Sequence, residues 1–482
     1  MSKTGLVSFA ATLALLTGCK AVGPDFHSPA PPNTAGYQMS GDAAPTEVAM
    51  SADARAGGAW WKAFGSNDLD AVVDRALSGN PSLAEANASL ARMQELAIVT
   101  HAAQLPQVDT NAALESERIN LTAFGFTGFP GLNITNPTLG LYTIGGTVSY
   151  DLDVFGGLRR ATEAARARAE AQARQADAAY LTLTGQTTMA ALQIATIRAE
   201  IAAAQQTVDE DRQVLDIVHA AQAAGGEAPS ASASATAQLA QDEAALPPLR
   251  QQLAQSRHAL AQLVGQAPAE WAPPDFDLAS FNAPTQAPVS LPSALVRRRP
   301  DILVAEANLH AATAEIGVAT AQLYPDIKLT ANLAQTALSP TSLFSYNATG
   351  WTLASGVTQP VFHGGALRAN RRAAVDAANA ALAHYKGTVV AAFTQVADVM
   401  SAIAQDDAEI AAQTRAQGAA AAAVHDDEIA YKLGGGALLP VLDDERRLQA
   451  ARRTLVMAEG RRLADVAQLY VATAADWREA KS

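Results

Sequence analysis

The chain has 482 residues, a formal net charge of −13 and one cysteine; 49% of its residues are hydrophobic and only 5% are aromatic. One cysteine cannot form an internal disulfide, and the negative charge argues against nucleic acid as a partner, because a phosphate backbone is bound through clustered Lys and Arg. The hydrophobic share suits a globular or membrane chain rather than a disordered one. Beyond the N-terminus we find no run of about 20 apolar residues, so we expect no transmembrane helix. A mature chain that crosses a membrane must then do so as β-strands closed into a barrel.

The first 18 residues predict a lipoprotein signal peptide that ends at the only cysteine of the chain. Lys3, an apolar run from Val7 to Leu16 and small residues before the cut are typical of a secretory signal. Leu16-Thr17-Gly18-Cys19 has the pattern of a bacterial lipobox, so we expect a diacylglycerol on Cys19 and a further acyl chain, such as palmitate, on its freed amine. Lys20 stands where an Asp commonly retains lipoproteins in the inner membrane, which favours the outer membrane. The alternative is an ordinary signal peptide with a chance cysteine.

The mature chain begins with a Pro-rich tether and becomes regular near Trp60. Apolar residues at three-and-four spacing predict a helix from Leu69 to Ala103, which Pro106 follows. Alternating polar and apolar residues then predict strands near 108–114 and at 147–153. The segment 124–131 between them is rich in Gly and Phe, which is typical of an exposed loop at a membrane surface.

A run without proline from Leu158 to about Ala224 predicts one very long helix, or two in line. At about 1.5 Å per residue it would reach on the order of 100 Å. A break from Gly225 to Pro229 precedes a second helical stretch, 232–264, interrupted only at Pro247-Pro248. The result is a helical hairpin. A plain coiled coil is the alternative, but it leaves the strands unexplained.

The whole arrangement occurs twice, which indicates two internal structural repeats. Pro81 and Pro106 are 25 residues apart, and so are Pro300 and Pro325. In the second half we expect strands at 327–333 and 351–362, a long helix at 367–433, a break at Gly434-Gly435-Gly436 and a helix at 438–474. The predicted parts are a signal peptide (1–18), a lipid anchor and tether (19–59), a first repeat (60–268), a linker (269–299), a second repeat (300–474) and a C-terminal tail (475–482).

Four strands cannot close a membrane barrel, because even the smallest such barrels use about eight. We therefore expect an oligomer. Three copies would supply twelve strands for one shared barrel and a ring of helices for a tunnel beneath it, and cyclic symmetry would close both. The sequence thus predicts an α+β membrane protein with four strands per chain.

Several motifs resemble those of one family, the outer-membrane lipoproteins of resistance-nodulation-division (RND) efflux systems, which are NodT-type outer membrane factors with a TolC-like fold. The motifs are Val22-Gly23-Pro24-Asp25-Phe26, Trp60-Trp61-Lys62-Ala63-Phe64, Leu291-Pro292-Ser293-Ala294-Leu295 and Arg297-Arg298-Arg299-Pro300-Asp301-Ile302. The resemblance implies a homotrimer with a 12-strand barrel in the outer membrane and a long periplasmic helical barrel. It also implies two partners, a periplasmic adaptor protein and an inner-membrane efflux pump.

The resemblance further implies a periplasmic gate just after the second helical turn, at Leu439, Asp443 and Arg446. Spacings of four and three residues allow these side chains to share a helix face. In a trimer an apolar ring can block a narrow passage by dewetting, and a carboxylate ring can pair with arginines. Possible support comes from Asp444, Glu445 and Arg447, and the turns expected to contact the adaptor hold Gly225, Gly226, Gly434, Gly435 and Gly436.

Two features of the tip depart from the family pattern, and its charged residues have an alternative interpretation without a gate. We expect Pro440 to bend the helix, and the Ser-Ala run from Ser230 to Ser234 leaves the contribution of the first hairpin to the gate open. The acidic run at 443–445 could also be a solvated surface.

The sequence offers no parts for an enzyme. It contains no HExxH, GxSxG or GxxxxGK[ST] motif, and its eight histidines, His363 among them, show no ligand spacing. We therefore predict no catalytic residue, no metal site and no cofactor other than the lipid on Cys19. Two alternatives to an RND exit duct stay open: a structural periplasmic coiled-coil lipoprotein, and the same duct serving a non-RND exporter. The sequence does not identify the cargo.

Overall fold

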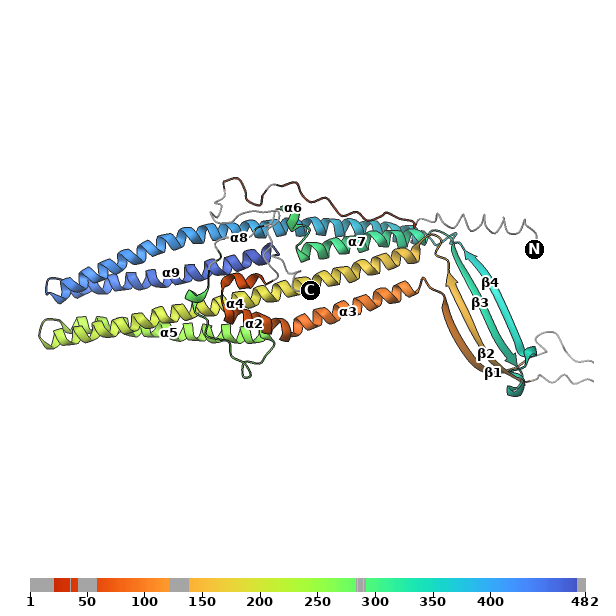
Figure 1. Ribbon diagram of the computed structural model, residues 1–482, viewed down its shortest axis with the longest axis horizontal. Helices are drawn as coiled ribbons and strands as arrows, with labels where there is room; N and C mark the ends of the chain where they lie inside the picture. The colour runs from red at the N-terminus through yellow and green to blue at the C-terminus, as the bar shows by residue number, and fades with distance from the viewer. Residues whose placement is uncertain are drawn as a thin grey trace, which may run out of the picture. The chain divides into compact units, whose positions relative to one another are not determined.

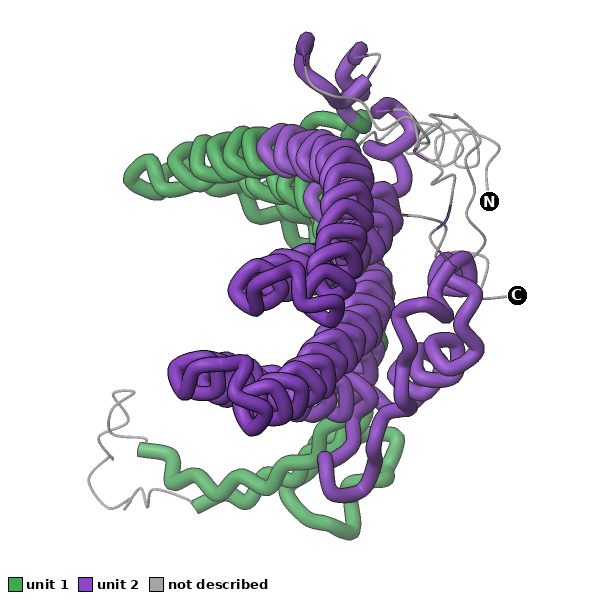
Figure 2. Tube along the Cα trace, turned by 90° about the vertical axis from the view of Figure 1, so that its left-hand side faces the viewer, with its two compact units in different colours: residues 1–28, 91–171, 306–384 green, residues 29–90, 172–305, 385–482 purple. Residues whose placement is uncertain are grey.

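The computed structural model describes residues 21–34, 36–41, 59–120, 138–282, 284, 289 and 292–474. The predicted signal peptide, Cys19 and the predicted loop at 124–131 lie outside these residues. The chain forms two compact units, each built from segments of both halves of the sequence (Figure 2). Unit 1 comprises residues 1–28, 91–171 and 306–384, and unit 2 comprises residues 29–90, 172–305 and 385–482.

Unit 1 contains one antiparallel sheet of four strands in the order β1-β2-β3-β4 (Figure 1). The strands are β1 (Gln107–Arg118), β2 (Thr138–Asp151), β3 (Asp326–Ala337) and β4 (Thr349–Thr358), with short 3₁₀ turns at Pro340–Ser342 and Tyr346–Ala348 between the last two. The central pair joins the two halves of the sequence, since Val148 of β2 lies opposite Ala331 of β3. All four predicted strands exist, but β4 ends at Thr358, four residues before the predicted end at Phe362.

The helices follow the predicted order in each half of the chain (Figure 1). Their bounds are α2 (Asn67–Gly79), α3 (Pro81–Ala102), α4 (Gly157–Ala223), α5 (Pro229–Val264), α6 (Pro292–Leu295), α7 (Pro300–Ala321), α8 (Ala366–Lys432) and α9 (Leu438–Ala472), with 3₁₀ helices η2 (Trp60–Phe64) and η4 (Leu278–Ser280). Helices α4 and α8 each have 67 residues, about 100 Å at 1.5 Å per residue. The first long helix is therefore one helix and not two in line.

The prediction of a single helix from Leu69 to Ala103 is wrong, because the chain breaks between α2 and α3 at Asn80. Asn80 is extended, with φ −73° and ψ 121°, as expected for a residue before proline, which is pushed out of the helical region. Its Oδ1 atom accepts hydrogen bonds from the backbone N–H groups of Ser82 and Leu83 at 2.8 and 3.2 Å. Asn80 thus stops α2 and caps α3.

The predicted interruption at Pro247-Pro248 is also wrong, because α5 continues through both prolines. The neighbouring Leu246 and Leu249 are buried, so packing on both sides offsets the hydrogen bonds that the prolines remove. The helix also begins at Pro229, three residues earlier than expected. Proline suits this first position because its missing N–H would be unpaired there in any case.

Among the described helices, α8 is the one that is long and apolar enough by length and composition to cross a membrane, with an 18-residue window of mean hydropathy 1.4. No such window was expected from the sequence, which predicted no transmembrane helix. Alanine contributes to the hydropathy of α8, as in the run from Ala419 to Ala423.

The main core of unit 2 contains residues of the Trp-Trp-Lys-Ala-Phe and Arg-Arg-Arg-Pro-Asp-Ile motifs, packed around the middle of the long helices. Trp60 and Trp61 are each 2% exposed, and Trp60 stacks on Tyr470 of α9 with ring centroids 5.4 Å apart. Arg299 of the Arg-Arg-Arg-Pro-Asp motif binds both oxygens of Asp301 at 2.9 and 3.0 Å and donates to the carbonyl of Ala472, the last residue of α9, at 2.9 Å. These motifs therefore join the start of α7 to the end of α9.

Candidate functional site

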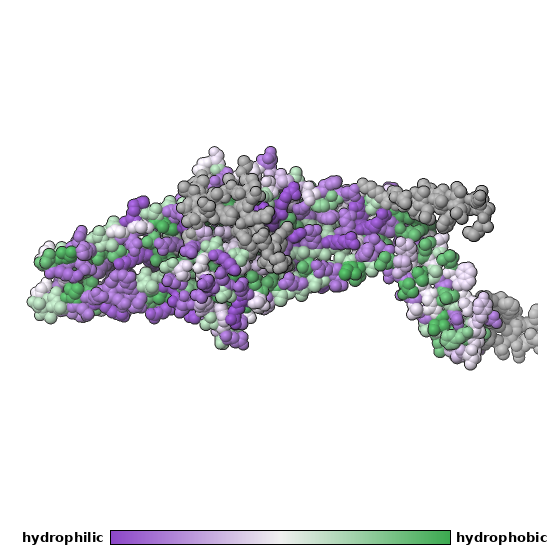
Figure 3. All heavy atoms as spheres, viewed as in Figure 1, coloured by the Kyte–Doolittle hydropathy of each residue, from purple (hydrophilic) through white to green (hydrophobic). Residues whose placement is uncertain are grey.

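The sheet of unit 1 has one apolar and one polar face. On one face the register aligns Val108, Val148, Ala331 and Leu353 across the four strands, together with Trp351, which is 76% exposed. Residues on the opposite face are mostly polar, and Asn332 there donates to Thr147 Oγ1 at 2.8 Å. Hydrophobic side chains are visible along the strands in Figure 3. A sheet whose apolar face stays exposed fits a wall between lipid and water.

The outer edges of this sheet are open among the described residues. In the part of the chain that the structure describes, strand β1 pairs only with β2, and strand β4 only with β3. An unpaired strand edge is a ready template for another chain, and a membrane leaves no water to satisfy its N–H and C=O groups. The sheet therefore needs further strands before it can line a membrane pore.

Unit 2 ends in two helical turns with the same construction, as the sequence predicted. Gly225 after α4 and Gly434 after α8 have φ values of +76° and +75°, in the left-handed region that favours glycine. Gly226 donates to the carbonyl of Ala221, and Gly435 donates to that of Ala430, both at 2.9 Å. These bonds close the last turn of each long helix. Contact of the turns with an adaptor stays a prediction.

The two turns are held together by a small apolar cluster, which we call the tip cluster. It comprises Val214 and Val218 of α4, Ala235 of α5, and Leu438 and Leu442 of α9. Tyr431 of α8 packs on it and donates from its hydroxyl to Glu227 Oε1 at 3.1 Å. The start of α9 is therefore packed against the first hairpin.

The three predicted gate residues lie on the exposed side of α9. Leu439 is 68% exposed, and the side chains of Asp443 and Arg446 are each 51% exposed. Arg446 Nη1 lies 3.5 Å from Asp443 Oδ1, and Arg446 Nε donates to Gln238 Oε1 of α5 at 2.7 Å. Pro440 lies in the first turn of a continuous α9, where its lack of an N–H removes no helical bond, so the bend expected there is not needed.

The three supporting residues divide between the two sides of α9. Arg447 is exposed and donates to Asp444 Oδ1 at 2.6 Å. Asp444 and Glu445 are 9% and 6% exposed, so Asp443 is the one member of the acidic run that is largely solvated. Burial, followed by the charges of Glu428 and Glu210, raises the pKa of Glu445 to about 7.

Sequence reasoning missed two carboxyl pairs, one in each hairpin, and in each pair one carboxyl group is buried. Asp211 and Asp406 are each 4% exposed. Burial and then the neighbouring Asp242 raise the pKa of Asp211 to about 7, and burial and then Asp465 do the same for Asp406. The sequence did contain a signal, because residues at nearly equal distances from the turn of a hairpin lie opposite one another. Asp211 and Asp242 lie 15 and 16 residues on either side of Gly226, and Asp406 and Asp465 lie 29 and 30 residues on either side of Gly435.

Further polar contacts tie α9 to the first hairpin. Arg452 donates to both carboxylate oxygens of Glu210 at 3.0 and 2.9 Å. Arg453 lies 3.8 Å from Glu200. Farther along α9, a Cβ atom on Gly460 would lie only 2.2 Å from Thr196 Oγ1, so α9 and α4 approach closely there.

The motif that follows the predicted lipid site is docked within unit 1. The backbone N–H of Val22 donates to the carbonyl of Phe155 at 3.0 Å. Arg160, which is 5% exposed, donates to the Val22 carbonyl at 3.2 Å and to Asp25 Oδ1 at 2.7 Å. Phe26 stacks on His310 of α7 with centroids 4.4 Å apart. The lipid modification itself stays a prediction.

Within the described part of the chain, no group of three or more His, Cys, Asp or Glu side chains could hold a metal ion.

The amphipathic sheet and the two helical hairpins define an outer-membrane channel protein with a TolC-like fold. The solved outer-membrane channel OprN has this fold, with a TM-score of 0.85 and 28% identity over 95% of this chain and 99% of that chain.

Residues 72–266 and 291–475 match the family described as outer membrane efflux protein, and the chain belongs to this family. A relative, the pyoverdine export outer membrane protein OpmQ of Pseudomonas aeruginosa, is 30% identical over 475 residues, which are 97% of each chain. Another, the probable outer membrane lipoprotein SilC of Salmonella typhimurium, is 25% identical over 482 residues, 99% of this chain and 100% of that protein. The predicted family, the TolC-like fold, the outer-membrane location and the role as an efflux channel are confirmed.

Proposed function

We propose that three copies of the chain form the exit duct of a tripartite efflux pump. Their sheets close into a 12-strand barrel in the outer membrane, their hairpins form a tunnel in the periplasm, and a periplasmic adaptor joins the tunnel to an inner-membrane pump. The observation that carries this proposal is the four-stranded sheet with one apolar and one polar face and two open edges. Three such sheets can satisfy one another's edges while the polar faces line a wet lumen.

The gate is proposed at the start of α9. In each protomer Arg446 is held between Asp443 and Gln238, and Arg452 is held by Glu210, so the second hairpin is tied to the first. Threefold symmetry turns Leu439 and Asp443 into rings. Opening then requires that α9 leave its partners on α4 and α5. The first hairpin thus supplies the acceptors that hold the gate closed.

The cargo follows from the pump rather than from the duct. The names of the relatives point to different cargoes, pyoverdine for OpmQ and cations for the cation efflux system protein CusC of Escherichia coli. The exposed carboxylate of Asp443 favours cations at the tip. In planar bilayers we expect Asp443→Asn to lower the cation preference of single channels, whereas Asp426→Asn, at an exposed site on α8, should not. An unchanged cation preference in Asp443→Asn would refute the proposal that Asp443 favours cations.

The partner proposal is tested by photo-crosslinking in living cells. A photoreactive residue replaces Gly435 at the turn, and a matched control replaces Gly418, where no atom lies within 4 Å of an added Cβ. We expect capture of a periplasmic adaptor from position 435 and not from position 418, with mass spectrometry to identify it. Capture of only peptidoglycan-associated or structural proteins would support the scaffold alternative. An adaptor of another exporter class would keep the duct and replace the pump.

A further inference from the structure

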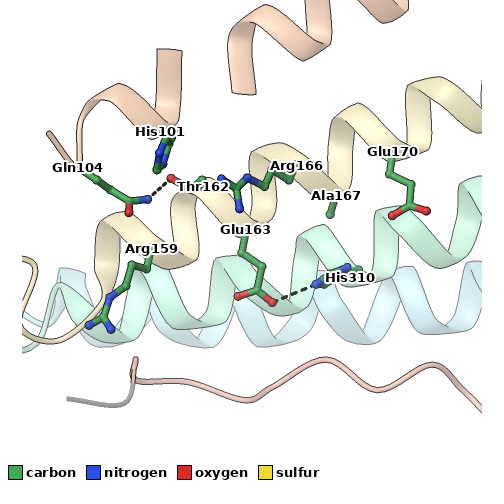
Figure 4. Close-up of a pocket in the computed structure, with 9 residues that line it drawn as sticks. All are labelled: His101, Gln104, Arg159, Thr162, Glu163, Arg166, Ala167, Glu170 and His310. Atoms are coloured by element: carbon green, nitrogen blue, oxygen red, sulfur yellow. Dashed lines mark hydrogen bonds and ion pairs between the residues drawn. The ribbon is translucent and has the colours of Figure 1, made fainter. Parts of the chain in front are cut away.

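A cavity of about 320 Å³ lies in unit 1 where the end of α3 faces the first turns of α4 (Figure 4). Histidine side chains face it from α3 and α7, and charged side chains project from α4. Its lining consists of His101, Gln104, Arg159, Thr162, Glu163, Arg166, Ala167, Glu170 and His310. The efflux function described above uses none of these residues.

Several polar groups around the cavity already satisfy one another. Glu163 accepts from Arg160 Nη1 at 2.7 Å and hydrogen-bonds His310 Nε2 at 3.0 Å. Burial acts to raise the pKa of Glu163, but the hydrogen bonds from Arg160 and His310 outweigh it and hold this pKa below its ordinary value. Arg159 pairs with Asp153 at 3.3 Å. The negative charge of Glu163 is therefore neutralised inside the wall.

Two groups of the lining stay without a partner among the described residues. Arg166 forms no ion pair or hydrogen bond there, and His101 Nδ1 is buried without a hydrogen-bond partner. Figure 4 shows His101 reaching toward the cavity from α3 while Arg166 extends from α4. An arginine and a histidine from two helices suit a compact anion, since Glu163 is neutralised and Glu170, the other carboxylate of the lining, also has an interaction partner. Arginine in particular matches the geometry of phosphate oxygens.

The position of the cavity relates it to the ends of the strands. His101 is in the last turn of α3, and β1 begins at Gln107. On α4, Thr162 and Arg166 follow the first helical residue by five and nine positions, about 8 and 14 Å along the axis. The headgroup layer of a bilayer is about 5–8 Å thick on each side. If the strands span the membrane, the long Arg166 side chain can therefore reach the headgroups.

We propose that this cavity binds a phosphate group, delivered by a phospholipid headgroup of the periplasmic leaflet, with Arg166 and His101 as its ligands. The inference rests on the proposed function, because it uses the membrane placement of the strands. A bound headgroup would join the end of α3 to the start of α4 at the foot of the barrel. Free inorganic phosphate has the same chemistry and is the second source that the experiment must separate.

The experiment compares the full-length channel with two variants extracted in mild detergent. Arg166→Gln removes the proposed ligand, and Arg372→Gln changes an exposed arginine near the start of α8 that does not line the cavity. Native mass spectrometry counts the phospholipids retained by each assembly. Thermal unfolding with added inorganic phosphate, after the lipid is removed, provides the second arm.

We expect the unmodified channel and Arg372→Gln to retain phospholipid and Arg166→Gln to bind it roughly tenfold more weakly, as for the loss of one charge-assisted contact. Stabilisation by inorganic phosphate that Arg166→Gln abolishes, with no lipid retained by any form, would assign the site to free phosphate. Equal behaviour of the two variants in both arms overturns the proposal. Conductance of the same preparations separates the two claims, since a conducting channel without the Arg166 effect refutes only this inference. A chain that neither assembles nor conducts refutes the proposed function and this inference with it.

Discussion

The two helical hairpins have nearly the same dimensions but different side chains at their tips. Helices α4 and α8 both have 67 residues, α5 and α9 have 36 and 35, and each turn uses a glycine with positive φ. The first turns of α5 carry serine and alanine. Those of α9 bury Leu438, Val441 and Leu442 and carry the charged run from Asp443 to Arg447.

The two hairpins therefore share their backbone construction and differ in the side chains at their tips. The second hairpin supplies the hydrogen-bond donors of these contacts, two arginines and a tyrosine. The first hairpin supplies the acceptors, which are Gln238, Glu210 and Glu227. The sequence left the contribution of the first hairpin to the proposed gate open, and these contacts support the proposal that it has one. Substitutions that break one kind of contact at a time can distinguish the effects of helix packing, of buried carboxyl groups and of the exposed contacts of Arg446.

The largest effect is expected at a close approach of α9 to α4, at Gly460. Gly460→Ala places a methyl group 2.2 Å from Thr196 Oγ1, so the helices must separate or Thr196 must rotate. We expect a loss of about 1–3 kcal/mol in the free energy of unfolding. Urea or thermal unfolding of the full chain in detergent measures it.

A matched control uses a glycine in the open part of the second hairpin. Gly418 of α8 has no atom within 4 Å of an added Cβ, so Gly418→Ala should stabilise the helix by about 0.5–1 kcal/mol. Opposite signs for the two variants support a close contact between the hairpins at Gly460. Equal small gains would show that α9 does not press on α4.

A smaller effect concerns the buried carboxyl groups and the pH. Glu445 has a pKa raised to about 7 in the folded chain, so the folded state holds a proton that the unfolded state has released above its ordinary pKa of 4.5. The contribution of Glu445 to the free energy of unfolding is therefore fully present at low pH and falls as the pH rises towards about 7. Asp211 and Asp406 act in the same direction.

Glu445→Gln removes one of these three contributors. We expect the loss of stability between pH 5 and pH 8 to become about one third shallower, if the three groups contribute alike. Hydrogen exchange of the α9 amides across that range provides the measurement. Asp426→Asn, an exposed site on α8, serves as the control and should follow the unmodified chain. A steeper slope in Glu445→Gln would contradict a protonated Glu445.

Much of this architecture could be predicted from the sequence, because periodicity and glycine turns are local signals. The four strands, both long helices and both turns follow from them. The break at Asn80 was missed because the helical pattern continues across it, and α5 passes through Pro247-Pro248 because its packing is tertiary.

Some residues of the candidate site could likewise be predicted from the sequence, and others could not. Leu439, Asp443 and Arg446 share an exposed face, which helical spacing can predict. Gln238 could not be found by such reasoning, since it lies on another helix, 208 residues before Arg446. The burial of Glu445 likewise depends on neighbours from other helices, α4 and α8.

The smallest effect, and the most direct test of a gate held by contacts between the hairpins, is the single-channel conductance of Arg446→Gln. This variant loses the bond to Gln238 and the pair with Asp443, about 1 kcal/mol for a partly exposed contact, or roughly a fivefold shift towards open channels. Arg415→Gln, at an exposed site of α8, is the control and should conduct as the unmodified channel does. If the contacts of Arg446 hold the gate closed, we expect more frequent or larger openings in Arg446→Gln and in neither of the other two forms. Identical conductance in all three forms would contradict it.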